Sequence, residues 1–177
     1  MGVDLIQKNI SIETKRLYLV PMNYDFILKV MENDISAYDL LGAVKTELWP
    51  ESADIKDILH IIRDNLKSKP YPDGFDAWLF ISKENRTVVG DGGFKGIPDG
   101  NGVIDIGYAI IEAQRQKGFA FEAVSALLKW GLSQDGVTAI TADCLNNNIP
   151  SINLLIKIGM SEIEKKDGLL FYRIERE

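Results

Sequence analysis

The chain has 177 residues and a formal net charge of −6, with 46% hydrophobic and 26% charged residues, an ordinary globular composition. Its length favours one domain, and its acidic balance argues against a general nucleic-acid-binding protein, which would usually carry a basic face. Cys144 is the only cysteine and His60 the only histidine, so an intrachain disulfide and a zinc-type ligand cluster are both excluded, and no metal is expected.

No run approaches the roughly 18 apolar residues that a membrane span needs. The N-terminus lacks a basic region followed by an apolar stretch. We therefore expect neither a membrane span nor a secretory signal, and the cytoplasm is the default location.

The first part of the chain predicts one strand and two helices. Residues 12–20 alternate apolar and polar side chains and predict a strand that ends at Pro21. Asn23 is a typical N-cap residue, and apolar residues at helical spacing follow it. Residues 40–50 are predicted to be a connection, and a second helix is predicted over residues 55–66.

The second part of the chain begins with an antiparallel meander and continues with alternating helices and strands. The predicted strands are Ala77–Ser82, Thr87–Phe94, Val103–Ile111, Thr138–Cys144, about Ser161–Lys165 and Leu169–Ile174, and the helices are about Gly118–Ser133 and Pro150–Ile158. The sequence therefore predicts a single α/β (α+β) domain over residues 1–177. Its mixed, mostly antiparallel sheet has the order β-α-α-β-β-β-α-β-α-β-β.

The loop Arg115-Gln116-Lys117-Gly118-Phe119-Ala120 has the features of an anion site. A strand delivers it to a helix start, where the first amides lack internal partners and the helix dipole is positive. Gly118 and Ala120 are small enough for a phosphate to approach the backbone, and Arg115 and Lys117 add positive charge. The pattern alone is not specific, and it is neither a Walker loop nor a dinucleotide fingerprint.

Further motifs occur in order around this loop. They are Val89-Gly90-Asp91-Gly92-Gly93-Phe94, Ile104-Asp105-Ile106-Gly107-Tyr108-Ala109-Ile110, Glu122-Ala123, Asn148-Ile149-Pro150-Ser151 and Lys157-Ile158-Gly159-Met160. Together they resemble the GNAT superfamily of N-acetyltransferases over residues 88–160. The resemblance is greatest to the RimJ/RimL-like branch, which modifies protein N-termini and, in some members, small amines.

The resemblance implies that acetyl-coenzyme A is the co-substrate. It implies a sheet that splays open beside Val103–Ile111, with the pantetheine arm along the backbone of Ala109, Ile110 and Ile111. The diphosphate is then expected on the amides of Lys117, Gly118, Phe119 and Ala120, beside Arg115 and Gln116, and Asn148 is expected to face the pantetheine arm. The partner is an amine acceptor, either a peptide N-terminus or a small amine, and a homodimer is common in the family.

Two residues are candidates for the chemistry that the resemblance implies. Asp105 stands where the family commonly has a glutamate and is the candidate base, although simple alternation along a strand also explains it. Ser151 is the candidate group for the leaving sulfur, because Leu155 occupies the place of the family's tyrosine. Ser151 could equally support the first turn of its helix. The amide of Ile110 or Ile111 could polarise the carbonyl, or could pair within the sheet.

Other residues have plain structural explanations beside functional ones. A covalent route through Cys144 is conceivable, but a core residue is the preferred interpretation. His60 is expected on the surface. Trp49, Tyr71 and Phe75 could wall an acceptor pocket or pack under loops. The acceptor itself is expected to be set by the loops at residues 21–50 and 67–76.

Three functions compete. The first is an N-acetyltransferase that transfers the acetyl group directly, without an acyl-enzyme. The second is a non-catalytic coenzyme A-binding sensor or interaction module, which the aspartate at position 105 and the leucine at position 155 keep open. The third, a nucleotide-binding α/β protein, is disfavoured by the antiparallel meander.

Overall fold

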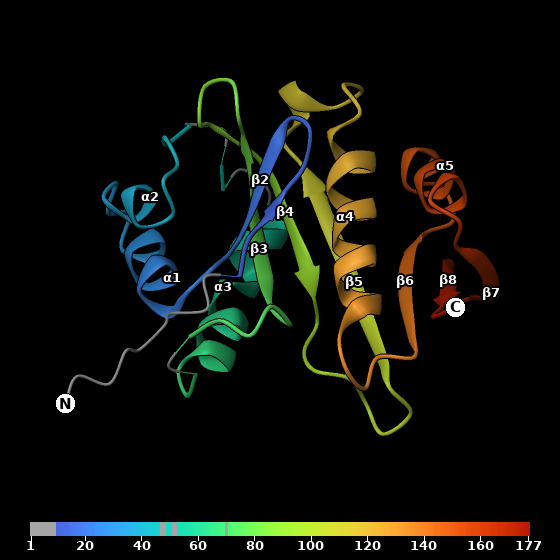
Figure 1. Ribbon diagram of the computed structural model, residues 1–177. Coiled ribbons are helices and arrows are strands. Elements are labelled where there is room, and N and C mark those ends of the chain that lie inside the picture. The colour runs from blue at the N-terminus through green and yellow to red at the C-terminus, as the bar shows by residue number, and fades with distance from the viewer. Residues whose placement is uncertain (1–9, 47–48, 51–52, 70) are drawn as a thin grey trace.

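The computed structural model describes residues 10–46, 49–50, 53–69 and 71–177. Residues 1–9, which include the segment searched for a leader, lie outside it. The strands are β1 (Ile12–Glu13), β2 (Leu17–Pro21), β3 (Ala77–Ser82), β4 (Val88–Phe94), β5 (Val103–Ile110), β6 (Ala139–Leu145), β7 (Ser161–Lys166) and β8 (Leu169–Glu175). The helices are α1 (Tyr24–Met31), α2 (Ala37–Leu40), α3 (Ala53–Leu66), α4 (Phe119–Ser133) and α5 (Ile149–Lys157), with a single 3-10 turn, η1 (Glu112–Gln114). The strands form one eight-stranded sheet in the order β1-β2-β3-β4-β5-β6-β8-β7 (Figure 1).

The predicted first strand is wrong in one respect, because residues 12–20 form a hairpin instead of a single strand. β1 and β2 pair antiparallel, with Ile12 opposite Leu19. The turn closes on Thr14, whose N–H donates to the Leu17 carbonyl at 2.9 Å and whose hydroxyl accepts from the Leu17 N–H at 3.0 Å. Pro21 belongs to β2 and does not follow it. A hydroxyl side chain that bonds nearby backbone offers the chain a turn in place of a continuous strand.

Most other predicted elements are confirmed with small shifts at their ends. Asn23 caps α1, since its side-chain oxygen accepts from the Phe26 N–H at 2.8 Å. The short helix α2 was not expected next to the predicted connection at residues 40–50. It forms because Tyr38 buries its ring, 5% exposed, against Phe26 and Trp49. Tertiary packing of one aromatic residue therefore decides a structure that local pattern does not indicate.

Two hydrophobic cores lie on opposite faces of the sheet. Side chains alternate between the faces of a strand, so a strand such as β3 contributes to both cores. On one face, Ile104 and Ile106 of β5 pack in a core with α4 and α5. On the other face, Leu79 and Ile81 of β3 pack in a core with α1, α2 and α3. The sheet therefore separates two layers of helices, α4 and α5 on one side and α1, α2 and α3 on the other.

The sheet splays open beside β5, as the resemblance implies. On one edge, β5 pairs antiparallel with β4 from Ile106 to Ile110. On its other edge it pairs parallel with β6 over Val103 to Asp105 only. Beyond Asp105 that edge of β5 has no ladder partner among the described residues, while β6 continues beside β8. The fold thus leaves a gap in the sheet next to the loop that enters α4.

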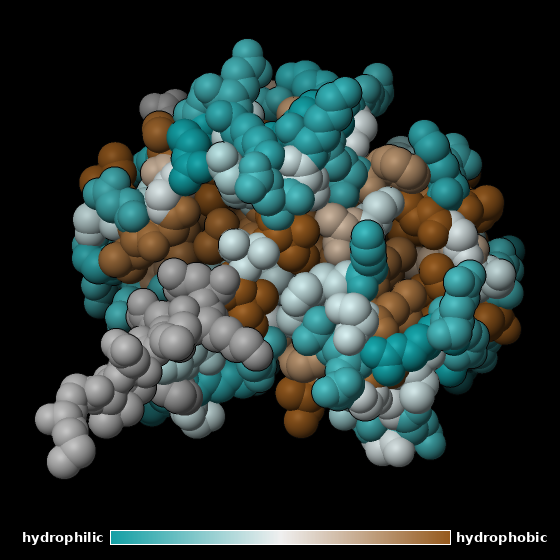
Figure 2. Space-filling model, in the orientation of Figure 1, coloured by the Kyte–Doolittle hydropathy of each residue, from teal (hydrophilic) through white to brown (hydrophobic). Residues whose placement is uncertain are grey.

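Exposed apolar side chains gather over the helices. Figure 2 shows them in two areas, over α1 and α2 and over α4 and α5, with polar residues covering the end of the molecule where the loop before α4 lies. The exposed residues in these areas include Met31, Ile35, Leu40, Phe121 and Ile156. None of the helices in the described part of the chain is long and apolar enough to cross a membrane.

Candidate active site

The loop that enters α4 is open to solvent and its helix start is uncapped. Gly118 precedes the helix with φ 80°, a left-handed conformation that glycine adopts without strain. Among the residues that the structure describes, no side chain caps this helix, and the first amides of a helix have no partners within it. Residues 115–118 are exposed, and Phe119 and Ala120 are half-buried. The predicted anion site is therefore reachable by a ligand.

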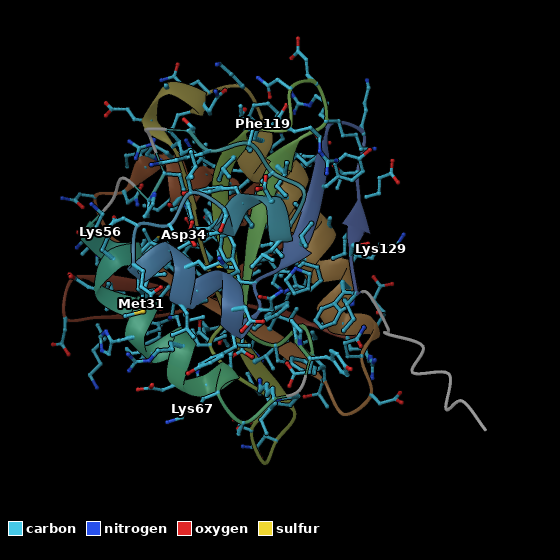
Figure 3. The ribbon with its side chains drawn as sticks, turned by 90° about the vertical axis from the view of Figure 1, so that its left-hand side faces the viewer. Met31, Asp34, Lys56, Lys67, Phe119 and Lys129 are labelled. Carbon is cyan, nitrogen blue, oxygen red and sulfur yellow. The ribbon has the colours of Figure 1, made fainter. Side chains whose placement is uncertain are left out.

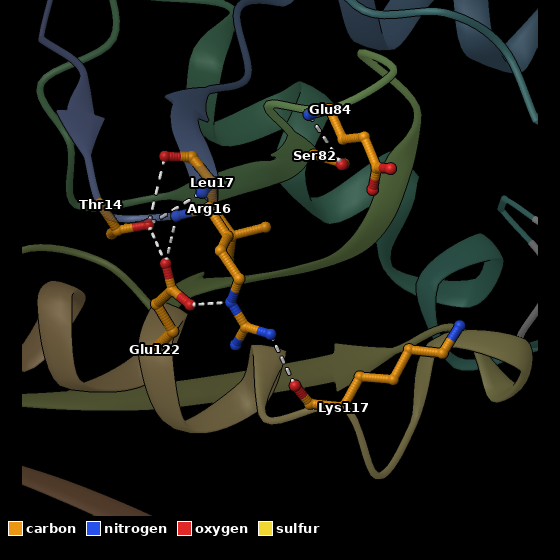
Figure 4. A network of polar contacts seen from close by, with 7 residues as sticks. All are labelled: Thr14, Arg16, Leu17, Ser82, Glu84, Lys117 and Glu122. Atoms are coloured by element: carbon orange, nitrogen blue, oxygen red, sulfur yellow. Dashed lines mark hydrogen bonds and ion pairs between the residues drawn. The ribbon is translucent and has the colours of Figure 1, made fainter.

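A network of polar contacts joins the β1–β2 hairpin to the first turn of α4 (Figure 4). The Arg16 Nε atom pairs with Glu122 Oε2 at 2.7 Å, and Arg16 Nη1 donates to the Lys117 carbonyl at 2.8 Å. The Thr14 hydroxyl donates to Glu122 Oε1 at 2.7 Å. Burial alone would raise the pKa of the Glu122 carboxyl. The hydrogen bonds from Thr14 and Arg16 together outweigh burial, so the pKa lies below its ordinary value. Glu122 is therefore held ionised and paired.

Arg16 is a cation beside the predicted anion site, and no pattern in the sequence indicates it. A side chain placed on Gly118 would meet Arg16 Nη2 at 3.3 Å, so this guanidinium borders the helix start. It also stacks 4.6 Å from the centre of the Phe119 ring. Because the hairpin and the loop lie about a hundred positions apart in the chain, no local pattern links them.

The two predicted cations of the loop are engaged in local contacts. Arg115 Nε donates to the Ile110 carbonyl at 3.1 Å, which folds this side chain onto the end of β5. Lys117 Nζ donates to Gln114 Oε1 at 2.9 Å. Gln116 has a positive φ of 60° and is exposed. These side chains lie in the exposed loop that enters α4.

The backbone of β5 presents polar groups to the gap at alternate residues. The Ile111 N–H donates to the Val89 carbonyl at 3.0 Å, and the Asp105 carbonyl accepts from Lys95 at 2.9 Å. In an antiparallel ladder the groups of alternate residues face the partner strand. The backbone N–H and C=O groups of Ala109 and Ile111 therefore face β4, whereas those of Ile110 face the gap. Of the two amides considered for polarising a carbonyl, that of Ile111 is already used within the sheet.

Asp105 lies on β5 where its pairing with β6 ends, opposite Thr141. Lys95 Nζ lies 3.1 Å from its Oδ1 atom and 3.0 Å from Asp143 Oδ1. Burial raises the pKa of Asp105, and this effect outweighs the lowering by Lys95. Asp105 is four residues from Ala109, about 13 Å along an extended strand. A base at Asp105 thus reaches the part of the gap beside Ala109 and Ile110 only through other groups or water.

Ser151 and Asn148 begin α5, on the other side of the gap. The Asn148 Oδ1 atom accepts from the Ser151 N–H at 3.3 Å and caps the helix. The Tyr108 hydroxyl is buried and has no well-aligned hydrogen-bond partner in the described part of the chain. Burial raises its pKa, and the nearby Ser151 hydroxyl lowers it by a smaller amount. Leu155, at the place of the family's tyrosine, is 1% exposed in the core.

Cys144 and His60 have the structural places expected for them. Cys144 is buried, and burial raises the pKa of its thiol, which disfavours the nucleophilic thiolate. His60 is exposed on α3. Among the described residues, no group of three or more His, Cys, Asp or Glu side chains is placed to hold a metal ion.

Two cavities are candidates for an acceptor. The larger, about 580 Å³, is lined by the end of β2, the start of α1 and the loops near residues 40 and 70. It includes Lys67, which lies at the opposite end of the molecule from Phe119 (Figure 3). β2 is also three strand positions from β5, about 14 Å at ordinary strand spacing. The smaller, about 420 Å³, is lined by α3, β4 and the open half of β5. The smaller cavity is therefore the one that adjoins the gap.

The aromatic residues expected near an acceptor have other roles. Trp49 is 3% exposed, stacks on Phe26 and donates from Nε1 to Asp91 Oδ2 at 2.8 Å. Phe75 packs against Trp130. Tyr71 is 45% exposed and lines only the larger cavity.

Comparisons with known proteins agree with this geometry. The acetyltransferase (GNAT) domain family matches residues 16–161. An uncharacterized N-acetyltransferase of Bacillus subtilis, YjdG, is 35% identical over 150 residues, which is 85% of this chain and 89% of that protein. The uncharacterized N-acetyltransferase p20 of Bacillus licheniformis is 38% identical over 123 residues, 69% of this chain and 64% of that protein.

Solved structures show the same fold. An acetyltransferase of the GNAT family from Bacillus anthracis has a TM-score of 0.64 and 23% identity, covering 94% of this chain and 99% of that one. RimL, a ribosomal alpha-N-protein acetyltransferase in complex with coenzyme A, has a TM-score of 0.65 and 14% identity, covering 94% and 98%. The sheet that parts beside β5, the uncapped helix start and the family match together assign this chain to the GNAT family of acetyl-CoA-dependent acetyltransferases.

Proposed function

We propose that the chain moves the acetyl group of acetyl-coenzyme A directly to a primary amine, without an acyl-enzyme, and that its 177 residues form one catalytic domain. The observation that carries the proposal is the exposed, uncapped start of α4 beside the open edge of β5. Burial of Cys144 with a raised thiol pKa favours direct transfer over a covalent intermediate.

The cofactor would be held from both ends of the gap. The amides of Lys117 to Ala120 would bind the diphosphate, with Arg16, Arg115 and Lys117 as surrounding cations and Gln116 at the rim. The pantetheine arm would run beside β5 and bond the backbone of Ile110, once Arg115 releases the Ile110 carbonyl. Ala109 and Ile111 would flank this contact on either side of Ile110. The free amide hydrogens of Asn148 would face the same arm.

The chemistry needs a proton acceptor and a group for the leaving sulfur. We assign the base role to Asp105, acting through water, with a raised pKa that brings it closer to the working range. Ser151 and the adjacent Tyr108 hydroxyl would hydrogen-bond and protonate the sulfur. The Ile110 amide would polarise the thioester carbonyl.

The acceptor class is a peptide N-terminus or a small-molecule amine. An α-amino group has a pKa of about 8 and a lysine amine about 10.4, so an N-terminal acceptor demands less of the base. The structural likeness to RimL, whose name states a ribosomal-protein α-amine as its acceptor, supports the same class here.

A thiol-release assay tests the proposal. Wild-type protein is given acetyl-coenzyme A and a panel of peptides, polyamines and aminoglycosides. We expect thiol release with at least one acceptor, and a loss of at least tenfold in kcat for Asp105→Asn. Tight cofactor binding with no turnover on any acceptor would favour the non-catalytic coenzyme A-binding module. Absence of binding would contradict both.

A further inference from the structure

The cavity of about 420 Å³ has the size of an ordinary small-molecule site. It lies between α3 and the β4–β5 ladder, and its walls are apolar in large part. The helix contributes Ile55, Ile58, Ile61 and Ile62. Only part of these apolar side chains is covered by the protein, since Ile58 is 44% exposed and Ile61 is 50% exposed. An apolar ligand would therefore bury surface that the chain leaves open.

Gly107 keeps the strand side of this cavity open. A side chain placed there would meet nothing closer than Lys95 Cε at 3.9 Å. Its backbone is ordinary strand, without the positive φ that requires glycine. Glycine at position 107 therefore leaves room in the cavity and is not required by the backbone conformation.

Asp91 gives the cavity a buried negative charge. Its side chain lines the cavity and is 9% exposed, and Trp49 Nε1 donates to its Oδ2 atom at 2.8 Å. Within the described residues no Lys or Arg pairs with it, because the cations nearby have other partners. Lys69 pairs with Asp76, and Lys95 lies between Asp143 and Asp105. A buried carboxylate with one neutral donor is costly unless a cation joins it.

Asp91 also lies next to the place that the acetyl group would reach. It is directly opposite Ala109 in the β4–β5 ladder, where paired Cα atoms are about 5 Å apart. Ala109 adjoins Ile110, which faces the gap. Asp105 lies on the same face but about 13 Å further along the strand. An amine held by Asp91 is therefore much nearer to the thioester than one held by Asp105.

We propose that this cavity is the acceptor site and that it takes a primary amine carried on an apolar body, with the ammonium group on Asp91. This inference rests on the proposed function, because it names the acceptor of the same reaction. Asp91 contacts the substrate and is a catalytic residue, and the proton then leaves along the same face of the sheet toward Asp105 and solvent.

The atoms of the transfer balance as follows. The ammonium gives one proton to the Asp91 carboxylate, and the neutral nitrogen forms a bond to the carbonyl carbon. The carbon–sulfur bond breaks with its electron pair on sulfur. The sulfur takes a proton from the Tyr108 or Ser151 hydroxyl, and the second nitrogen proton replaces it through water, which gives an amide and a free thiol. Asp91 finally releases its proton through water.

The site predicts an order of acceptors. The walls are largely isoleucine, and the other charged residues that line the cavity, Asp76 and Lys95, already have ionic partners, so linear polyamines and aminoglycosides should be poor substrates. A free arylalkylamine and a peptide with an apolar N-terminal residue share the chemistry that the cavity recognises. We expect phenethylamine or a Phe-initiated tripeptide to exceed spermidine by at least tenfold in kcat/KM. Whichever of phenethylamine and the tripeptide has the higher kcat/KM shows whether the acceptor is a small-molecule amine or a protein N-terminus.

Two variants with matched controls test the site. Asp91→Asn keeps an oxygen for the Trp49 hydrogen bond and removes the charge, and Gly107→Val fills the cavity from the strand side. Each should lower kcat/KM for the preferred amine at least tenfold, while the Kd for coenzyme A stays within twofold. The controls are Asp64→Asn on the surface of α3 and Gly100→Val in an open turn, where no atom lies within 4 Å of the added carbon.

The outcomes separate this inference from the proposed function. Unchanged amine kinetics in both variants, with active wild-type protein, overturns the acceptor site and leaves the acetyltransferase proposal intact. A preference for spermidine over the apolar amines also overturns it. Wild-type protein that releases no thiol with any acceptor refutes the proposed function itself. Thermal unfolding confirms that each variant is folded before its kinetics are compared.

Discussion

At the scale of single residues, buried ionisable groups on β4 and β5 set the character of the site. Burial raises the pKa of Asp91 to about 6, and the Trp49 hydrogen bond lowers it only in part. In the unfolded chain the same carboxyl titrates at its ordinary value of 3.8. The folded protein therefore binds more protons at this residue than the unfolded chain does between these two values. Asp91 makes folding less favourable as the pH rises through that window.

Replacing this carboxyl should consequently stabilise the protein at neutral pH. We expect Asp91→Asn to raise the free energy of unfolding at pH 7 by about 1–3 kcal/mol, the order of a two-unit pKa shift. Toward pH 4 most of this difference should disappear, because the carboxyl of the folded wild type is then protonated. Urea unfolding of both proteins from pH 4 to 7 measures this difference, with Asp64→Asn as the control. A variant that is less stable at pH 7 would refute the assignment of a strained charge.

The Tyr108 hydroxyl supports a second prediction at this scale. It is buried without a well-aligned partner and lies beside Ser151 at the gap. If it donates to the leaving sulfur, Tyr108→Phe should lower kcat roughly tenfold or more, within the range of general acid effects. The KM for acetyl-coenzyme A should change little. A Tyr108→Phe Ser151→Ala double variant should lose less than the product of the two single losses, since both residues serve one atom. Equal kcat in Tyr108→Phe and wild type would mean that the hydroxyl has no part in catalysis and that Tyr108 only packs.

At the scale of elements, the β1–β2 hairpin and α4 act together through Arg16. An exposed ion pair usually contributes at most about 1 kcal/mol to stability. We therefore expect Arg16→Ala to change the free energy of unfolding by less than that amount but to raise the Kd for coenzyme A roughly tenfold, because a cation at the helix start is lost. Arg63→Ala, which removes a surface pair on α3, is the matched control. Titration calorimetry gives the Kd, and an unchanged value in Arg16→Ala would remove it from the anion site.

The same element shows where sequence reasoning succeeded and where it failed. The strand, loop and helix around Gly118 were predictable because their signals are local: alternation, small residues and a helical apolar period. The split of residues 12–20 into a hairpin depends on Thr14 and on its contact with Glu122, a residue 108 positions away. Arg16 and Asp91 became candidates only when the fold placed them beside the loop and the gap. A single sequence does not show which residues far apart in the chain lie close together in the fold.

At the scale of the molecule, the gap divides the sheet into two parts that share few ladder contacts. β5 and β6 are joined by three residue pairs, whereas β6 and β8 are joined by seven. A cofactor bound between β5 and α5 would bridge the two parts and complete the edge of β5. Binding to the folded state alone stabilises it by about 2.7 kcal/mol at a ligand concentration of 100 times Kd.

For a domain of this size, that binding free energy predicts a rise of about 5–10 °C in Tm. Coenzyme A should therefore raise the Tm of the wild type by this amount and should slow amide exchange in β5 and in the first turns of α4 and α5. Gly118→Glu should show no such shift, because a side chain is strained at φ 80° and its carboxylate repels the diphosphate. Differential scanning fluorimetry with increasing coenzyme A compares the two proteins. Equal shifts in both would mean that the cofactor binds elsewhere, since no diphosphate can share the helix start with a glutamate at residue 118.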